Sequence, residues 1–386
     1  MTDAAETVNY KALIAEAQQH LEKGAVIKAM QIYYDLHERD PNSTEVLRRL
    51  VGINLHMEIH DQAIINLQKL IQLDPLQSAY YDQLAEVYGK LRDWDEACET
   101  YYGLILRTPK LPEAHFNLAF YLRRAGKFEE SIDSYQRALR YGIKQAEEVH
   151  LNIAVIYADD LRKEAEAEEH LHKALKLNEH YIPALYNLAN LHEDRGDREE
   201  TIGLFRRILA TDPANAKAMA RLAPLTVDNP ALDPLVPRLY EASKSKGVSL
   251  SDKIDVLYAL GKVHNDCEEY DLAFDNYSAA NALNALEFQP YDTSTAETYF
   301  QQIIDTVTPD WIAANQRAGD EQPVFICGMF RSGSTLVEQM LAAHPEITAG
   351  GERDTLIREL TDPVLQYPAG LASLEKTALH DIADRY

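Results

Sequence analysis

Hydrophobic and polar residues alternate along most of the chain with the spacing of paired amphipathic helices. Pro41, Pro75 and Pro109 lie 34 residues apart, and hydrophobic residues recur every three or four positions between them. With each proline placed at the end of a unit, small residues fall at equivalent positions of the helix pairs: Ala17 and Ala29, Val51 and Ala63, Ala85 and Ala97, and Ala119 and Ser131. Small residues let helices pack closely, so the pattern predicts a series of helix pairs.

Larger residues recur at the positions that fill the space between neighbouring pairs. They are Leu50, Leu84, Leu118 and Leu188 on the first helices, and Tyr33, Leu67, Tyr101, Tyr135 and Phe205 on the second helices. The pattern predicts seven helix pairs between about Tyr10 and Ala285, with an irregular, proline-containing stretch at Ala214–Gly247. This organisation resembles the tetratricopeptide repeat. The resemblance implies an α-solenoid over residues 1–285, with a concave face that holds a peptide or partner helix.

One position on the first helices carries asparagine in three successive pairs. Asn117, Asn152 and Asn187 are each 35 residues apart. A row of side-chain amides can bind the backbone of an extended peptide, because each amide has a donor and an acceptor. The row resembles the asparagine ladder of repeat-bearing O-linked N-acetylglucosamine transferases. The alternative is that asparagine is a common residue at this position and faces solvent. Phe116, Phe120 and Tyr186 lie near the same face as candidate aromatic anchors, and for at least one of them packing between repeats is the favoured role.

The pattern changes near residue 286. Residues 286–321 predict a helical connector, with Thr293 or Ser294 as an N-cap and with Tyr299, Phe300 and Trp311 packed away from water. The apolar run Val324–Cys327 predicts a buried strand, and a glycine-punctuated loop follows it. A helical pattern then begins, with its apolar residues at Leu336, Val337, Met340 and Leu341. Strand, glycine loop and helix together direct backbone N–H groups toward an anion.

The loop has the glycine spacing of a nucleotide-binding P-loop without its lysine. Gly328 and Gly333 are followed by Ser334 and Thr335, so a serine occupies the lysine position. That lysine contacts the β- and γ-phosphates of a nucleoside triphosphate, so a nucleotide kinase or NTPase is disfavoured. Arg331 is the replacement charge, since its planar guanidinium can hold two oxygens of a phosphate or sulfate.

The motif R-S-G-S-T-L after an apolar run, followed by A-x-H-P and G-G-E, resembles the 5′-phosphosulfate loop of sulfotransferases that use 3′-phosphoadenosine 5′-phosphosulfate. Protein-tyrosine sulfotransferases and bacterial sulfotransferases with N-terminal tetratricopeptide repeats share this pattern, with Pro and Thr where this chain has Phe330 and Ser334. The resemblance implies a role for Glu352 as general base and for Arg331 in stabilising developing charge. It assigns co-substrate binding to Arg331, Ser332, Gly333, Ser334 and Thr335. The alternative for Glu352 is a carboxylate stabilised by the dipole of the helix that follows it.

The fold class expected is mainly α: a tetratricopeptide-repeat α-solenoid (residues 1–285), a helical connector (286–321), and the start of an α/β P-loop-like sulfotransferase domain (322–386). A second predicted strand covers Glu346–Ala349. The Arg and Ser that hold the 3′-phosphate in the resembled family have no match in residues 322–386. We therefore expect an incomplete pocket in this chain and a longer natural enzyme. The acceptor hydroxyl, whether on a protein tyrosine, a glycan or a small molecule, stays open. The alternative function is a non-catalytic repeat scaffold with a residual phosphate loop.

Composition limits the partners and cofactors. With 38 basic and 62 acidic residues the net charge is −24 and the pI is about 4.9, which argues against nucleic acid and acidic membranes as partners. Cys98, Cys267 and Cys327 are too scattered for a disulfide framework and are expected to be core thiols. Most of the histidines fall in separate repeats, and His170 and His172 point to different helix faces, so no metal site is expected. No signal or membrane-spanning pattern is present, and a cytoplasmic location is expected.

Overall fold

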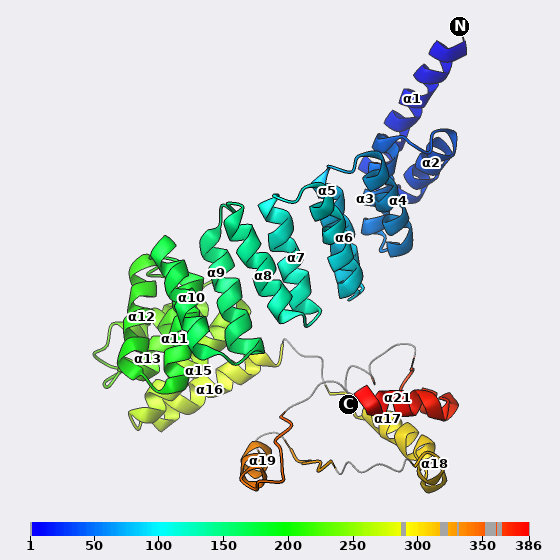
Figure 1. The fold of residues 1–386 in the computed structure, drawn as a ribbon. Coiled ribbons are helices and arrows are strands. Elements are labelled where there is room, and N and C mark those ends of the chain that lie inside the picture. The colour runs from blue at the N-terminus through cyan, green and yellow to red at the C-terminus, as the bar shows by residue number, and fades with distance from the viewer. Residues whose placement is uncertain are drawn as a thin grey trace. The chain divides into compact units, whose positions relative to one another are not determined.

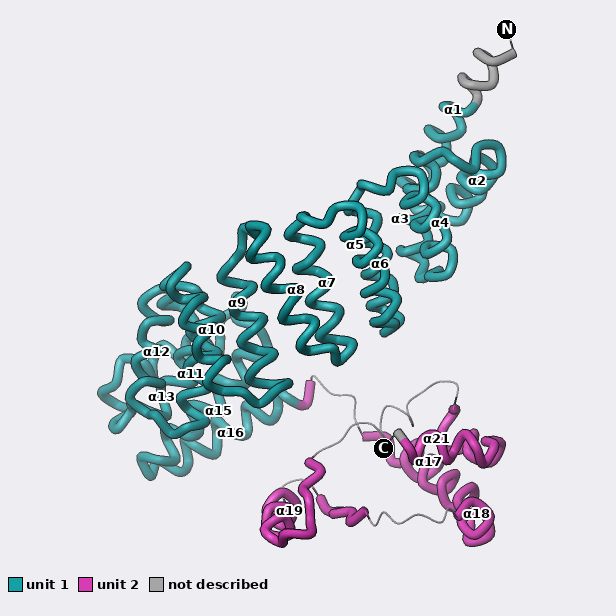
Figure 2. Tube along the Cα trace, viewed as in Figure 1, with its two compact units in different colours: residues 1–284 teal, residues 285–386 magenta. Residues whose placement is uncertain are grey.

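The computed structural model describes residues 2–286, 291–316, 323–329, 332–351, 360 and 365–385, with side chains described from Tyr10 onward. The chain divides into two compact units, Met1–Asn284 and Ala285–Tyr386 (Figure 2). Each unit is described separately below.

The first unit is a series of helix pairs joined by short turns and stacked side by side (Figure 1). The pairs are α1 (Thr2–Glu22) with α2 (Val26–Arg39), α3 (Thr44–His56) with α4 (His60–Leu73), α5 (Ser78–Lys90) with α6 (Trp94–Arg107), α7 (Pro112–Arg124) with α8 (Phe128–Arg140), α9 (Ala146–Val155) with α10 (Glu164–Leu177), α11 (Ile182–Arg195) with α12 (Arg198–Thr211), and α15 (Leu250–Asp266) with α16 (Tyr270–Asn284). The mainly α, repeat-based fold predicted from the sequence is confirmed.

Two helices between α12 and α15 form the irregular stretch. They are α13 (Ala216–Thr226) and α14 (Leu235–Lys244). Pro224 lies inside the last turn of α13, and the helix ends two residues after it. Proline removes a backbone donor and disfavours further helix, so this pair departs from the regular repeat.

Close packing inside each pair follows from the small residues. Ala17, Ala29, Ala63, Ala85, Ala97 and Ala119 are fully buried, and Val51 is 2% exposed. Ser131 takes the place of alanine in α8, and its Oγ donates a hydrogen bond of 2.6 Å to the Ala119 carbonyl oxygen. In the last pair Gly261 is required, because a Cβ there would lie 2.5 Å from the Tyr277 ring. The large residues predicted between pairs are buried as well, with Tyr33, Leu67 and Phe205 fully so.

Every regular pair turns through one residue in the left-handed backbone region. These residues are Gly24, Glu58, Arg92, Gly126, Arg162, Gly196 and Glu268, with φ from 56° to 82°. In most of the turns the next residue donates its N–H to a carbonyl near the end of the first helix, as Asp93 does to Tyr88 at 2.9 Å. That hydrogen bond closes the helix C-terminus and starts the reversal.

The described part of the second unit is helical. Its elements are α17 (Thr293–Thr306), α18 (Pro309–Ala314), α19 (Ser334–Ala342), η2 (Ala369–Ser373) and α21 (Lys376–Arg385). The N-cap of α17 is Asp292, whose carboxylate accepts hydrogen bonds from the Ser294 and Thr295 N–H groups. The expected caps, Thr293 and Ser294, are therefore wrong, because the carboxylate one residue earlier reaches these donors.

Three expectations for the second unit are corrected by the structure. Neither Val324–Cys327 nor Glu346–Ala349 is a strand. A strand exists only when a neighbour satisfies its backbone groups, and none of the described segments is a strand that could pair with these two. Val324 and Phe325 are 69% and 62% exposed, and Cys327 is exposed instead of being a core thiol. The ring centroids of Tyr299 and Tyr367 lie 6.1 Å apart, but Tyr299 stays 41% exposed. The expected packing of Tyr299 away from water is therefore wrong.

Candidate functional site

The described residues of the glycine loop are 328–329 and 332–333, and the two parts approach each other closely. The Ser332 N–H donates to the Met329 carbonyl oxygen at 3.1 Å. A Cβ at Gly328 would lie 2.6 Å from Ser332 Oγ, so a larger residue there would require the Ser332 side chain to rotate. Gly333 has φ 94°, in the left-handed region, and is the N-cap of α19. The predicted loop-to-helix transition is therefore present.

The N-terminus of α19 is suited to an anion. The first N–H groups of a helix have no acceptor within the helix, and no side chain caps α19. Ser334 and Thr335 occupy the first turn and add two hydroxyl groups there. These groups are donors at the positive end of the helix dipole, where an anion such as a phosphate or sulfate is stabilised.

Arg331, the predicted charge of the loop, and Glu352, the predicted general base, lie outside the described residues. The segment before Glu352 is tied back to the helix, because the Gly351 N–H donates to Glu338 Oε1 at 2.7 Å. This hydrogen bond places Gly351 next to α19, which carries Ser334 and Thr335. The roles of Arg331 and Glu352 stay predictions.

The three predicted ladder asparagines lie at equivalent places on α7, α9 and α11, and each is partly buried. Their hydrogen bonds differ. Asn117 donates to Asp82 Oδ1 at 3.2 Å and also hydrogen-bonds the Tyr101 hydroxyl. Asn152 hydrogen-bonds the Tyr135 hydroxyl. Asn187 donates at 2.9 Å to the Pro183 carbonyl oxygen of its own helix.

The asparagines differ in their hydrogen bonds because the second helix of the preceding pair differs. Tyr101 and Tyr135 occupy the equivalent positions of α6 and α8, and both present a hydroxyl to the asparagine of the next pair. The equivalent residue of α10 is Leu171, which is buried and has no hydroxyl. Asn187 therefore bonds its own helix. Burial, reinforced by Asp82, raises the pKa of Tyr101, so its hydroxyl stays a donor.

Sequence reasoning did not find Asp82, which joins two successive first helices. Its Oδ1 accepts hydrogen bonds from the Tyr101 hydroxyl at 2.8 Å and from Asn117. A cavity of ≈ 320 Å³ lies beside it, lined by Ser78, Asp82, Leu104, Leu111, Glu113, Ala114 and Asn117. The only sequence signal was the aspartate itself, because the equivalent position of the next first helix, 34 residues later, carries the aromatic Phe116.

The aromatic residues named for the same face have different environments. Phe116 packs edge-on against Tyr135 at 5.4 Å, so it belongs to the core between pairs. Phe120 is 44% exposed and lies under the Arg124 guanidinium. Tyr186 donates to Asn215 Oδ1 at 2.6 Å, with Lys217 over its ring at 5.5 Å. Phe120 and Tyr186 are the two that a ligand can reach.

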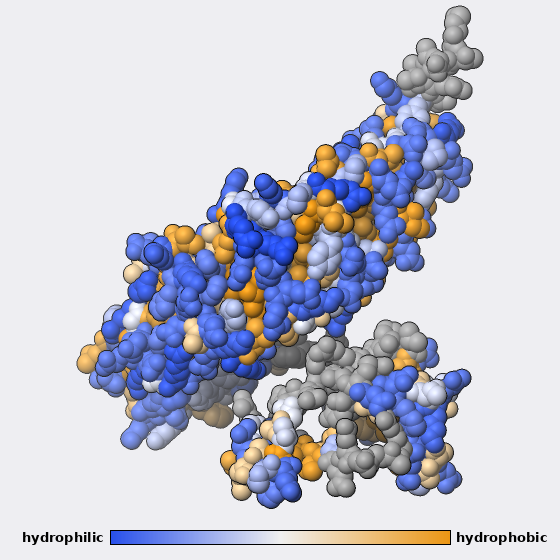
Figure 3. Space-filling model, viewed as in Figure 1, coloured by the Kyte–Doolittle hydropathy of each residue, from blue (hydrophilic) through white to orange (hydrophobic). Residues whose placement is uncertain are grey.

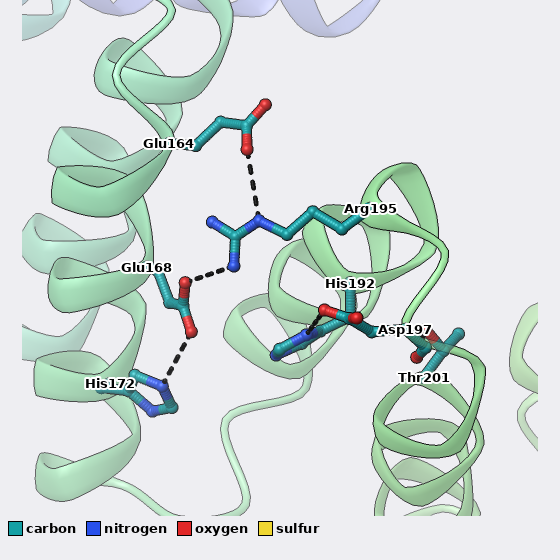
Figure 4. A network of polar contacts seen from close by, with 7 residues as sticks. All are labelled: Glu164, Glu168, His172, His192, Arg195, Asp197 and Thr201. Atoms are coloured by element: carbon teal, nitrogen blue, oxygen red, sulfur yellow. Dashed lines mark hydrogen bonds and ion pairs between the residues drawn. The ribbon is translucent and has the colours of Figure 1, made fainter.

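Arginine residues near the ends of the first helices are held by carboxylates. Arg123 pairs with Asp160 at 2.6 Å and with Asp159 at 3.5 Å, both in the π-helical segment η1 (Ile156–Asp160) that extends α9. Arg195 pairs with Glu164 and Glu168 on α10, at 3.2 and 2.6 Å (Figure 4). The Arg195 hydrogen bond lowers the pKa of Glu168. These pairs connect neighbouring helices.

Sequence reasoning also missed a hydrogen-bonded histidine pair, in which His170 is buried and His150 is partly buried. His150 on α9 and His170 on α10 share a hydrogen bond of 3.2 Å between their Nδ1 atoms. Burial lowers the pKa of His170 to about 4 and also lowers that of His150. The sequence separated them by 20 residues, and only the pairing of α9 with α10 brings them together. Among the described residues no group of three or more His, Cys, Asp or Glu could hold a metal ion.

Protein-family models match segments in both parts of the chain. The tetratricopeptide-repeat models match residues 112–142 and 184–217, which span α7–α8 and α11–α12 with the start of α13. The repeat array is a tetratricopeptide-repeat fold. The model of the sulfotransferase family matches residues 323–382, which include the glycine loop and α19.

Curated relatives match through part of their length. An uncharacterised protein of Aquifex aeolicus is 27% identical over 53% of this chain and 27% of its own length. A tetratricopeptide repeat and J domain-containing co-chaperone, DNJ1, of Fusarium oxysporum is 33% identical over 31% and 24%. The human protein O-mannosyl-transferase TMTC3 is 26% identical over 39% and 17%. The chain thus spans about a quarter or less of the length of these relatives.

Solved repeat structures cover part of this chain. MamA from Desulfovibrio magneticus RS-1 is 16% identical, covers 44% of this chain and 95% of its own, and has a TM-score of 0.37. PilF of Pseudomonas aeruginosa is 17% identical, covers 61% and 97%, and has a TM-score of 0.40. Among the described helices, none has the length and apolar content needed to cross a membrane.

Proposed function

We propose that this chain carries the phosphosulfate loop of a sulfotransferase, which transfers a sulfuryl group from 3′-phosphoadenosine 5′-phosphosulfate to an acceptor hydroxyl. The observation that carries the proposal is the left-handed Gly333 directly before the uncapped N-terminus of α19. The sulfotransferase family match covers the same residues. Domain limits of 1–285, 286–321 and 322–386 belong to the same proposal.

The loop residues have distinct roles in this proposal. The backbone N–H groups and hydroxyls of Ser332, Ser334 and Thr335 would hold the oxygens of the phosphosulfate, with Gly333 allowing the turn. Arg331 would add a guanidinium to the same oxygens and stabilise the charge that develops on them. Glu352 would accept the proton of the acceptor hydroxyl. The co-substrate itself would supply the sulfuryl group, and no metal is needed for these roles.

The repeats would recruit or present the acceptor. Tetratricopeptide repeats are generally protein-interaction modules, and the first helices here place Asn117, Asn152 and Asn187 in one row. A peptide or protein, including one with an acceptor tyrosine, is therefore the partner we propose. Nucleic acid and membrane are not among the proposed partners. The cytoplasmic location stays a prediction.

The test is calorimetric titration of the 386-residue chain with adenosine 3′,5′-bisphosphate, with ATP titrated beside it. The proposal expects binding of the bisphosphate and none of ATP. Arg331→Ala should weaken this binding, whereas Glu352→Ala should leave it nearly intact and abolish turnover of an acceptor. Equal loss of binding in both variants would give Glu352 a structural role. Binding of ATP as tightly as the bisphosphate would contradict the sulfotransferase assignment.

A second candidate is a non-catalytic repeat scaffold that keeps a residual phosphate loop. It is favoured by the exposure of α19, on which Leu336 and Met340 are 65% and 68% exposed. A helix with an uncovered apolar face is a poor support for a catalytic loop. Failure of both nucleotides to bind would mean that the pocket is incomplete in this chain, and the repeats would then be the functional part that it carries.

A further inference from the structure

Glu338 lies on α19, one helical turn after the start of the helix. Residues four apart lie on the same face of a helix, so Glu338 shares a face with Ser334. Side chains on a helix lean toward its N-terminus, which brings the Glu338 carboxylate closer to the first turn of α19 than its own backbone is. Ser334, Glu338 and Leu341 are partly buried, whereas Val337 and Gln339 are exposed. Glu338 therefore belongs to the face of α19 that other parts of the chain cover.

The carboxylate of Glu338 holds the backbone of Gly351. Its Oε1 accepts the Gly351 N–H at 2.7 Å. A hydrogen bond from an amide to a carboxylate is charge-assisted and is stronger than one between neutral groups. Gly351 has φ 67°, in the left-handed region, so the backbone changes direction at this residue. Glu352 follows directly in the sequence. The hydrogen bond thus joins α19 to the last described residue before the predicted general base.

A turn after α19 brings the chain back to Glu338. The Ile347 N–H donates to the His344 carbonyl oxygen at 3.1 Å, and the Glu346 N–H donates to His344 Nδ1 at 3.3 Å. These hydrogen bonds close a turn over the A-x-H-P motif. Four helical residues rise about 6 Å, and four extended residues can span about 13 Å. The segment from Ile347 to Gly351 is therefore long enough to return along α19 as far as Glu338.

Apolar packing contributes little to the attachment of this segment. Leu336 and Met340, two residues before and after Glu338, are exposed, and so is Ile347 on the returning segment. Figure 3, drawn from the same side as Figure 1, shows apolar surface of the second unit open to solvent. Side chains that stay in contact with water gain little free energy from burial. The hydrogen bond between Glu338 and Gly351 is therefore a main determinant of how the segment lies on α19.

We propose that Glu338 is a positioning residue, which holds Gly351 on α19 and thereby sets the place of Glu352 relative to the phosphosulfate loop. This inference rests on the proposed function, because it takes Glu352 as the base. In that reaction the acceptor oxygen bonds to sulfur, the bond from sulfur to the 5′-phosphate oxygen breaks, and the acceptor proton passes to Glu352. The base and the sulfur must be held in one geometry, and an error of about 1 Å can cost about 100-fold in rate. Glu338 contacts the backbone and not the reacting atoms.

The test measures turnover and co-substrate affinity in the 386-residue chain and three variants. The acceptors are a tyrosine-containing peptide, an oligosaccharide and 4-nitrophenol. Glu338→Ala removes the acceptor of the Gly351 N–H and should lower kcat by about 10- to 100-fold, whereas Glu338→Gln keeps an acceptor oxygen and should stay within about threefold of the wild type. The Kd of adenosine 3′,5′-bisphosphate should stay within about twofold in both. Glu346→Ala, which removes an exposed carboxylate of the same segment, is the matched control and should change neither quantity.

Nuclear magnetic resonance of the chain labelled with ¹⁵N-glycine reports the hydrogen bond directly, since the chain has 16 glycines. The Gly351 amide signal, assigned as the one absent from Gly351→Ala, should shift in Glu338→Ala and stay in place in Glu346→Ala. An unmoved signal, unchanged turnover in Glu338→Ala, or equal losses of kcat and bisphosphate affinity would overturn the positioning role and leave the proposed function standing. Equal loss of turnover in Glu338→Gln and Glu338→Ala would also overturn it. No turnover by the wild-type chain would refute the proposed function, and this inference with it.

Discussion

Acidification is expected to destabilise the repeat array through His170. This residue is 9% exposed, and its Nδ1 faces His150 Nδ1 at 3.2 Å. One ring donates and the other accepts while both are neutral. Protonation of the second ring nitrogen would place a charge away from water, beside Lys173, with only Glu169 opposing that effect. Burial is the largest cause of the lowered pKa, and Lys173 is the next.

The sign and size of the stability change follow from the pKa of His170 in the folded and in the unfolded chain. His170 has a pKa of about 4 in the folded protein, against 6.5 for an unperturbed histidine. Below 6.5 the unfolded chain binds the proton more readily, so stability is complete above that value and is lost as the pH falls toward 4. Between about pH 8 and about pH 5.5 the loss is about 1.4 kcal/mol, and below about pH 4 it reaches about 3 kcal/mol.

The assay is urea unfolding followed by circular dichroism at both pH values, for the wild-type chain and for His170→Gln. Glutamine cannot titrate but can still hydrogen-bond His150. The carboxylates and other histidines are common to both proteins, so the difference between their pH dependences isolates His170. The variant should lose about 1.4 kcal/mol less than the wild type, with unchanged urea slopes. Equal losses in the two proteins would refute the reasoning.

Two further predictions concern packing in the repeats. Asn54 on α3 is fully buried, and neither polar atom of its side chain has a hydrogen-bond partner among the described residues; Asn54→Leu should therefore raise the free energy of unfolding by about 1–3 kcal/mol. A lower urea midpoint for this variant would contradict the prediction. Gly261→Ala should cost about 1–3 kcal/mol because its Cβ would meet the Tyr277 ring at 2.5 Å. The control is Gly203→Ala on α12, where a Cβ meets nothing within 4 Å and alanine should stabilise the helix by about 0.5–1 kcal/mol. If both alanine variants changed the melting temperature in the same direction, the contact between the new Cβ and Tyr277 would not determine the stability of Gly261→Ala.

The repeat fold could be predicted from the sequence because its determining contacts recur at fixed spacing. Ala119 and Ser131 are 12 residues apart and touch directly, through the hydrogen bond from Ser131 Oγ. The same spacing recurs in every early pair, so each repeat supports the assignment of the others. The irregular α13 could be predicted too, since Pro224 limits the helix through its own backbone.

The candidate site was predictable only in its local part. Gly333 and the start of α19 follow from glycine spacing, because the left-handed residue and the helix N-terminus are neighbours in sequence. The strand at Val324–Cys327 was wrongly predicted, since a strand depends on a partner elsewhere in the chain. The ladder shows the same limit: periodicity places Asn117 but gives no sign that Asp82 on the preceding pair would bind it.

The turns of the helix pairs explain why the repeat geometry tolerates so much variation in sequence. Glycine occupies the left-handed position in three of the seven described turns, whereas Glu58, Arg92, Arg162 and Glu268 occupy the others. A non-glycine residue in this conformation costs about 1–2 kcal/mol. The turn forms nonetheless, because the buried helices on both sides fix its ends and backbone hydrogen bonds such as Ile59 N–H to the Asn54 carbonyl at 2.8 Å close it. Packing of the helices, and not the residue in the turn, therefore sets the reversal.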